Sequence, residues 1–251
     1  MVDGTVFSLH KRGNEFVLKY NGNELMSTNH TYSEQLLAEK GCAHIMESKG
    51  AVESSVREER QEKRGKGKKG ARRGKGQRGQ SSRPTHPKVL IGGLGLGFTL
   101  KRTLELVGSP ATVEVAELMP PIIEWNRTFL VEHNGPLLED PRTRIIQGDL
   151  FQILKAQPKG RYDALLFDID NTPDDLITGD NARLYSPAFL QHLQTLLTPG
   201  GQLSYWLSEP APKFKKLLEK VGFEVEVYPA KQRENSKRAI HCLYVCRPKQ
   251  R

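Results

Sequence analysis

The stretch Lys88-Val-Leu-Ile-Gly-Gly-Leu-Gly-Leu-Gly-Phe98 decides the fold, because an apolar run leads into a cluster of glycines and residues 99–108 follow with a helical pattern. This order predicts a β-strand, a glycine-rich turn and an α-helix. Gly93, Gly95 and Gly97 form a GxGxG pattern in the turn. A side chain at these positions would keep the backbone from closing on a nucleoside-bearing ligand over the strand end. The alternative is a tight turn without a ligand, since glycine motifs of this kind also occur there.

A second predicted strand, over residues 111–117, supplies the context that the glycine turn needs. This strand ends in an acid, Glu117. A carboxylate roughly twenty residues after such a turn binds ribose hydroxyls in dinucleotide sites and in AdoMet sites. The turn and Glu117 together therefore favour a nucleoside-binding site over a turn without a ligand.

Length and composition limit the class of protein. A chain of 251 residues with 37% apolar content can form one large domain, or a medium domain with a small one. It contains no apolar run of about 18 residues, and its N-terminus lacks the pattern of a signal peptide, so we expect a cytoplasmic protein without membrane contact. The three cysteines are too few for a disulfide framework. Cys242 and Cys246 lie on one face of a predicted strand, which favours packing over metal binding, and we expect no metal.

The net charge of +9 is concentrated in one segment. Residues 57–88 hold thirteen Lys and Arg against three Glu, which leaves the rest of the chain with a net charge close to −1. Gly, Lys, Arg, Gln and Ser dominate this segment and have almost nothing to bury. We therefore interpret residues 47–86 as a disordered insertion. Nonspecific contact with nucleic acid through residues 57–88 is the alternative, because a polycation binds polyanions.

The sequence pattern predicts one structured part before the insertion and one after it. Residues 1–46 read as a small antiparallel β unit and a helix over 31–41 that stops at Gly41. Residues 87–251 alternate between strands and helices. Their predicted strands cover 88–92, 111–117, 142–149, 161–168, 202–207, 223–228 and 239–246, and their predicted helices cover 99–108, 120–134, 186–197 and 211–221. Because no helix separates the last two strands, we predict an α/β, Rossmann-like, mostly parallel sheet that ends in an antiparallel hairpin.

With these motifs in place, the chain resembles the class I AdoMet-dependent transferases and, more narrowly, the spermidine synthase (polyamine aminopropyltransferase) family. The resemblance covers nearly the whole chain apart from the basic insertion. Tyr32-Ser-Glu34 is similar to the family's Tyr-x-Glu stretch, and the glycine turn is similar to its Gly-Gly-Gly-Asp-Gly. Segments 183–190 and 197–201 are similar to those that flank the helix after the fourth strand.

The resemblance implies a donor that is decarboxylated AdoMet or AdoMet, a small amine substrate, no metal, and a homodimer. It assigns donor binding to Gly93, Gly95, Gly97, Glu117 and Asp149 and, through the Tyr-x-Glu stretch, amine binding to Tyr32 and Glu34. From the acids that crowd the end of the fourth strand, we further expect Asp174 to bind the amine and Asp168 and Asp170 to be the candidate catalytic residues. The two catalytic acids would position the amine and deprotonate it.

Three departures from the family pattern concern the chemistry directly. Leu96 stands where we align the acid of the family's glycine loop, Asn171 stands where the family has a catalytic Asp, and residues 231–238 lack its Tyr-Pro segment. The acids that follow the fourth strand still suit a cationic amine, although Asp174 fits a solvated loop equally well. Aminopropyl transfer is therefore our first hypothesis and methyl transfer from AdoMet the second. A noncatalytic nucleoside-binding or RNA-associated protein is the third.

Overall fold

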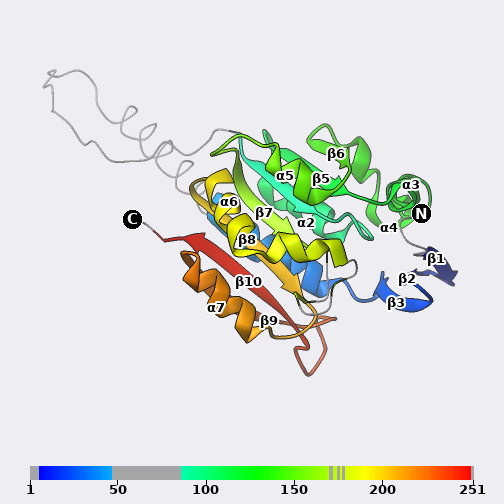
Figure 1. Ribbon diagram of the computed structural model, residues 1–251. Coiled ribbons are helices and arrows are strands. Elements are labelled where there is room, and N and C mark those ends of the chain that lie inside the picture. Colours follow the sequence, from blue (N-terminus) through cyan, green and yellow to red (C-terminus); the bar gives the residue numbers. More distant parts are fainter. Residues whose placement is uncertain (1–5, 47–85, 170–171, 174–175, 177–178, 250–251) are drawn as a thin grey trace, which may run out of the picture.

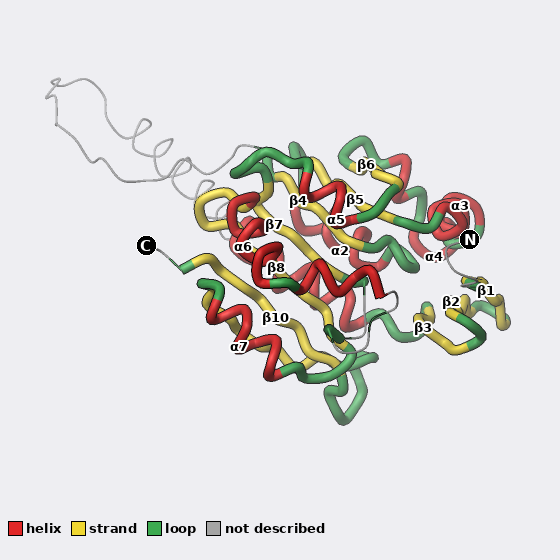
Figure 2. Tube along the Cα trace, viewed as in Figure 1, coloured by secondary structure: helices red, strands yellow, loops and turns green. Residues whose placement is uncertain are grey.

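The computed structural model describes residues 6–46, 86–169, 172–173, 176 and 179–249 (Figure 1). Two sheets organise these residues, one with three strands and one with seven. Helices cover both faces of the larger sheet, and the smaller sheet lies beside one end of it (Figure 2). Among the described residues, no helix combines the length and the apolar character needed to cross a membrane.

The larger sheet confirms the predicted fold. Its order is β6-β5-β4-β7-β8-β10-β9, parallel from β6 to β8, with β10 antiparallel to both β8 and β9. The strands are β4 (Lys88–Gly92), β5 (Thr112–Glu117), β6 (Thr143–Gln147), β7 (Tyr162–Phe167), β8 (Leu197–Leu207), β9 (Phe223–Ala230) and β10 (His241–Pro248). The order reverses between β4 and β7, which is the point where open α/β sheets bind ligands.

The smaller sheet is antiparallel, as the N-terminal pattern predicted. It consists of β1 (Phe7–Arg12), β2 (Glu15–Tyr20) and β3 (Asn23–Ser27). Gly22 has φ 83° and the preceding Asn21 has φ 49°, so the turn between β2 and β3 uses residues that tolerate left-handed backbone.

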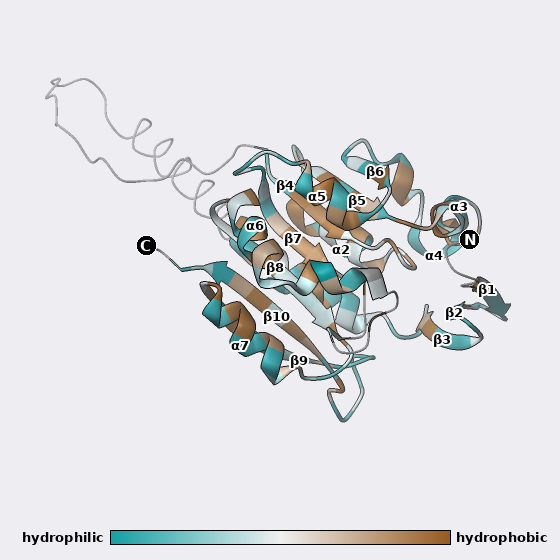
Figure 3. Ribbon diagram, viewed as in Figure 1, coloured by the Kyte–Doolittle hydropathy of each residue, from teal (hydrophilic) through white to brown (hydrophobic). Residues whose placement is uncertain are grey.

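Each face of the larger sheet carries its own hydrophobic core. On one face the buried side chains come from α5 (Leu150–Lys155), α6 (Pro187–Leu196) and α7 (Pro212–Lys220). On the other they come from a helix over residues 32–46, α2 (Phe98–Val107) and α3 (Pro120–Thr128). Hydrophobic colour lies along the inner strands, while α7 shows one hydrophobic and one hydrophilic side (Figure 3). Short helical segments complete the fold: α4 (Val131–Asn134), η1 (Leu137–Glu139) and η2 (Gly179–Tyr185).

The predicted helix stop at Gly41 is wrong, because the helix continues to residue 46. A Cβ at position 41 would collide with the Leu166 side chain and lie 3.1 Å from Ser204 Oγ. Glycine is therefore needed here for a close approach between helix and sheet, rather than for a left-handed cap. The helix that carries Tyr32 and Glu34 is thereby packed directly on β7 and β8.

Three other predicted boundaries also need correction. The predicted helix over 120–134 is divided into α3 and α4, since the Leu130 N–H bonds the Trp125 carbonyl (2.9 Å) and so interrupts the regular helical ladder. The predicted start of the fifth strand at residue 202 is also wrong, because β8 begins at Leu197 and includes segment 197–201, where its pairing with β7 is irregular. The short helix α5 was not predicted.

Candidate functional site

The glycine turn lies between β4 and α2, at the carboxyl edge of the sheet. Gly93 and Gly95 have φ values of 88° and 49°, in the region that favours glycine. A Cβ on Gly93 would collide with the Asp168 carbonyl oxygen, and one on Gly95 would lie 2.7 Å from Met26 Sδ. The turn is therefore enclosed by the end of β7 on one side and by the N-terminal sheet on the other.

Glu117 fastens this turn to the end of β5. Its carboxylate accepts the backbone N–H of Leu94 (2.9 Å) and that of Met119 (2.8 Å), and the side chain is buried. Burial raises the pKa of Glu117, and the backbone donors oppose that rise. The acid predicted at the strand end therefore lies against the glycine turn, as its spacing suggested.

Two asparagine side chains donate hydrogen bonds to backbone carbonyls of the glycine turn, and sequence reasoning identified neither. Asn126 Nδ2 donates to the Gly95 carbonyl (2.9 Å), and Asn134 Nδ2 donates to the Leu96 carbonyl (2.6 Å). Both asparagines are buried. The only available signal was a polar residue on an otherwise apolar helix face. Leu96 itself is 1% exposed and belongs to the hydrophobic core, so its side chain does not face an open ligand site.

A pair of carboxylic acids lies beside the turn. Asp168 follows β7 and accepts a hydrogen bond from Thr99 Oγ1 (3.1 Å), and Glu34 accepts one from Ser33 Oγ (2.6 Å). Burial raises the pKa of Glu34 to about 8, and the nearby charge of Asp168 raises it as well. Burial also raises the pKa of Asp168 to about 6, against the effect of the Thr99 hydroxyl. No Lys, Arg or His among the described residues forms an ion pair with either acid.

The remaining predicted residues divide into two groups. Tyr32 begins the helix over 32–46, and its backbone N–H donates to the Gln232 carbonyl (3.3 Å), which joins this helix to the connection between β9 and β10. Asp170, Asn171 and Asp174 lie outside the described residues, as does the basic segment up to residue 85.

Asp149 follows β6 and caps α5. Its Oδ1 accepts the backbone N–H of Gln152 (3.2 Å), and its Oδ2 forms an ion pair with Arg183 from η2. Sequence reasoning assigned a role to Asp149 but none to Arg183, although Arg183 begins segment 183–190, which resembles a family segment.

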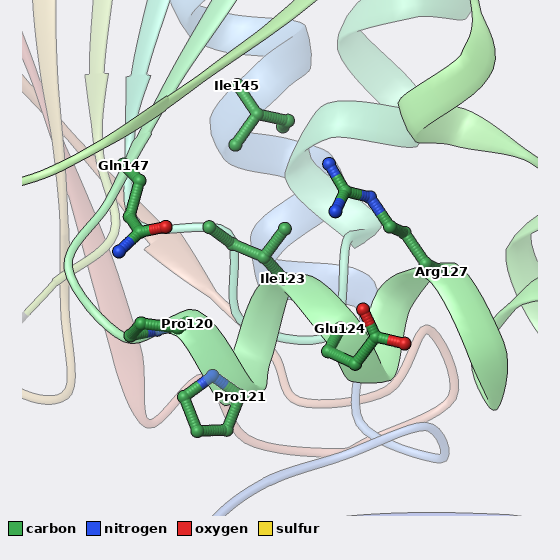
Figure 4. Close-up of a pocket in the computed structure, with 7 residues that line it drawn as sticks. All are labelled: Pro120, Pro121, Ile123, Glu124, Arg127, Ile145 and Gln147. Atoms are coloured by element: carbon green, nitrogen blue, oxygen red, sulfur yellow. The ribbon is translucent and has the colours of Figure 1, made fainter.

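A separate groove of about 520 Å³ lies at the edge of the sheet, between α3 and β6 (Figure 4). The residues that line it are Pro120, Pro121, Ile123, Glu124, Arg127, Ile145 and Gln147. None of the acids described above lines this groove, so it is not the candidate site.

Comparisons with known proteins give partial matches in sequence and a shared fold. No family model matches the chain. A polyamine aminopropyltransferase of Corynebacterium efficiens is 34% identical over 117 residues, which are 46% of this chain and 21% of that protein. A polyamine aminopropyltransferase of Mycobacterium tuberculosis is 33% identical over 124 residues, 49% of this chain and 23% of that protein. Putrescine N-methyltransferase 1 of Nicotiana tabacum is 29% identical over 133 residues, 50% of this chain and 33% of that protein. The matches thus span a third or less of these relatives' length.

Solved structures show the same fold. The spermidine synthase of Thermotoga maritima superposes with a TM-score of 0.65 at 18% identity, covering 99% of this chain and 70% of that one. A probable spermidine synthase of Corynebacterium glutamicum superposes with a TM-score of 0.61 at 11% identity, covering 97% and 77%. The fold is therefore that of the spermidine synthases, and the resemblance inferred from the motifs is confirmed.

Proposed function

We propose that this chain is an alkyltransferase that moves a group from an adenosyl sulfonium donor to a small amine. The observation that carries the proposal is the pair of acids Glu34 and Asp168, placed beside the glycine turn without a cationic partner among the described residues. Buried carboxylates with raised pKa values gather at functional sites, because an unpaired buried charge destabilises the fold. A positively charged substrate would supply the missing partner.

The donor would lie over the glycine turn. Gly93, Gly95 and Gly97 have positive φ values that shape this turn, and Glu117, which accepts backbone N–H groups of the turn, lies where the ribose would bind. Asp149, at the end of the neighbouring strand, would bind the adenine side of the donor. A donor of this class is supported by the names of the relatives matched in sequence, which are transferases.

The amine would lie between Tyr32, Glu34 and the acids that follow β7, Asp168, Asp170 and Asp174. Its nitrogen attacks the carbon bound to the sulfonium, a C–N bond forms, and the C–S bond breaks with its electron pair left on sulfur as a thioether. The proton on the attacking nitrogen passes to Asp168 or Asp170. Because its pKa is about 6, Asp168 is a stronger base near neutral pH than an ordinary aspartate.

Aminopropyl transfer from decarboxylated AdoMet is the form of this reaction that we favour. That donor carries an ammonium without a neighbouring carboxylate, so it gains from acids that an intact AdoMet, with both charges, needs less. Leu96 replaces the acid of the family's glycine loop, a loss that by itself favours AdoMet, but its side chain is buried in the core and does not face the donor. Similarity to a protein named putrescine N-methyltransferase keeps methyl transfer as the second candidate.

Competition between the two donors tests the choice. We expect decarboxylated AdoMet to bind more than about tenfold more tightly than AdoMet, a difference of about 1.4 kcal/mol, and to yield methylthioadenosine with putrescine or spermidine as acceptor. Tighter binding of AdoMet with adenosylhomocysteine as product would establish methyl transfer instead. If folded protein bound neither donor nor methylthioadenosine in calorimetry, the transferase proposal would be wrong.

A further inference from the structure

Arg183 joins two loops of the candidate site that are distant in sequence. It belongs to η2, which precedes α6 on the path from the end of β7, and its guanidinium pairs with Asp149 at the end of β6. The guanidinium carbon also lies 4.8 Å from the centroid of the Phe151 ring on α5, within the range of a cation–π interaction. The side chain therefore connects the loop on the amine side with the loop on the adenine side.

The backbone of Arg183 is held where its side chain can make this connection. Its carbonyl accepts hydrogen bonds from Ser186, through the backbone N–H (3.3 Å) and through Oγ (2.9 Å), at the cap of α6. The next two residues, Leu184 and Tyr185, are buried in the core. The guanidinium is thus fixed from both ends, which distinguishes this pair from a mobile surface ion pair.

Asp149 keeps acceptor capacity after its two protein contacts. One oxygen accepts the Gln152 N–H and the other pairs with Arg183, and a carboxylate offers about four lone-pair positions in all. With its rotation fixed by both contacts, the carboxylate presents the remaining lone pairs in a set direction. Such an acceptor binds an exocyclic amino group and repels a carbonyl oxygen at the same place.

Resting on the proposed function, we infer that Arg183 is a positioning residue that orients Asp149 for the 6-amino group of the donor's adenine and so sets the choice of base. Arg183 Nε is buried and has no hydrogen-bond acceptor among the described residues. The guanidinium therefore keeps one donor that no described residue satisfies.

Binding of methylthioadenosine and of its 6-oxo analogue, methylthioinosine, tests the inference by calorimetry. For Arg183→Met we expect affinity for methylthioadenosine to fall about tenfold, while affinity for methylthioinosine changes less than about twofold. Arg183→Lys keeps the charge but loses the planar fork, so it should recover part of the discrimination. It also serves as the measured variant if Arg183→Met does not fold.

Arg247→Met is the matched control, because Arg247 also forms an arginine–carboxylate pair, with Glu226 on β9 at the opposite end of the sheet. It should leave the ratio of the two affinities unchanged. An equal loss for both ligands in the Arg183 variants, or no loss for either, would overturn the inference while leaving the proposed function intact. Failure of the unmodified protein to bind methylthioadenosine would instead refute the proposed function, and the inference with it.

Discussion

Two groups of buried carboxylic acids lie at opposite edges of the same sheet, and they are compensated differently. Toward the amino edge, Glu114 accepts hydrogen bonds from Arg161 (2.7 Å) and the Tyr162 hydroxyl (2.7 Å), and lies 3.3 Å from Lys88 Nζ. Asp163 in the same region accepts the Lys88 backbone N–H (2.8 Å). These acids have their partners within the fold.

The acids at the carboxyl edge have only neutral partners among the described residues. Glu34 is bonded by a serine hydroxyl, Asp168 by a threonine hydroxyl and Glu117 by backbone N–H groups. Glu34 and Glu114 are both 5% exposed, so depth of burial does not explain the difference. At the amino edge Glu114 pairs with two cations, whereas Glu34 and Asp168 pair with none among the described residues, which is why we place function at the carboxyl edge and structure at the other.

The largest effect should come from Asp168→Asn, which removes the base and the negative charge while keeping the shape of the side chain. We expect kcat to fall by at least about 100-fold with little loss of stability, because the raised pKa shows that the fold disfavours the charged acid. Turnover with the preferred donor, together with thermal unfolding, measures both quantities.

Asp163→Asn makes the same chemical change at the other edge and is the control. It should lower stability by about 1 to 3 kcal/mol, because the amide replaces an acceptor of Lys88 N–H or Thr198 Oγ1 with a donor. Activity per folded molecule should persist. If both variants lost activity equally, the division between a functional and a structural edge would not hold.

Most of the larger sheet was predictable because its signals are local. Apolar runs that end in acids gave the positions of β5 and β7, and the glycine cluster gave the turn after β4. The compensation of the acids was not predictable, since it depends on contacts between distant residues. Gly41 is one example: the sequence suggests a helix stop, whereas its absent side chain lets the helix approach Leu166 and Ser204. That approach buries Glu34, which motif resemblance identified without indicating its raised pKa.

A second, smaller effect should follow from Glu114→Gln at the amino edge. The change leaves Arg161 and Lys88 without their shared carboxylate, although both cations are about a quarter exposed and so partly solvated. We therefore expect a loss of about 2 kcal/mol rather than the larger cost of a fully buried broken pair. Urea unfolding measures this loss of stability. Donor affinity of the folded variant should stay unchanged, because the amino edge has no role in binding the donor.

Glu34→Gln should make the protein more stable than the unmodified chain at high pH, although a substitution at a buried site usually lowers stability. In the folded protein the Glu34 pKa is raised to about 8, so between the ordinary glutamate pKa and pH 8 the folded state holds a proton that the unfolded state has lost. Stability from this group therefore falls as pH increases through that range. Gln cannot ionise, so the variant should match the unmodified protein near pH 4, and its advantage should grow with pH to about 2 kcal/mol or more near pH 9.

Binding of the amine should be weakened by the same substitution that raises stability. A cation bound beside Glu34 favours the charged acid, so amine binding should release protons near neutral pH and should weaken in Glu34→Gln. Greater stability with weaker amine binding is the combination expected of a functional acid. A variant that was less stable at pH 9 would show that Glu34 is compensated after all.

The smallest effect should follow from deletion of residues 58–85, the basic run between the two structured parts. The described chain ends at residue 46 before this run and resumes at residue 86 after it. Close to these two positions, His44 Nε2 lies 2.9 Å from the Asp163 carbonyl oxygen, and the Lys88 N–H donates to the Asp163 carboxylate (2.8 Å). The described residues on either side of the run therefore lie at the amino edge, across the sheet from the candidate site. Because the run has almost no apolar group to contribute to a core, we expect the deletion variant to fold, with a methylthioadenosine affinity within about twofold of that of the full chain.

Any salt-dependent binding of RNA should disappear with the deleted residues. Loss of donor affinity in a deletion variant that still unfolds cooperatively would connect the basic run to the carboxyl edge and contradict the separation of the two edges.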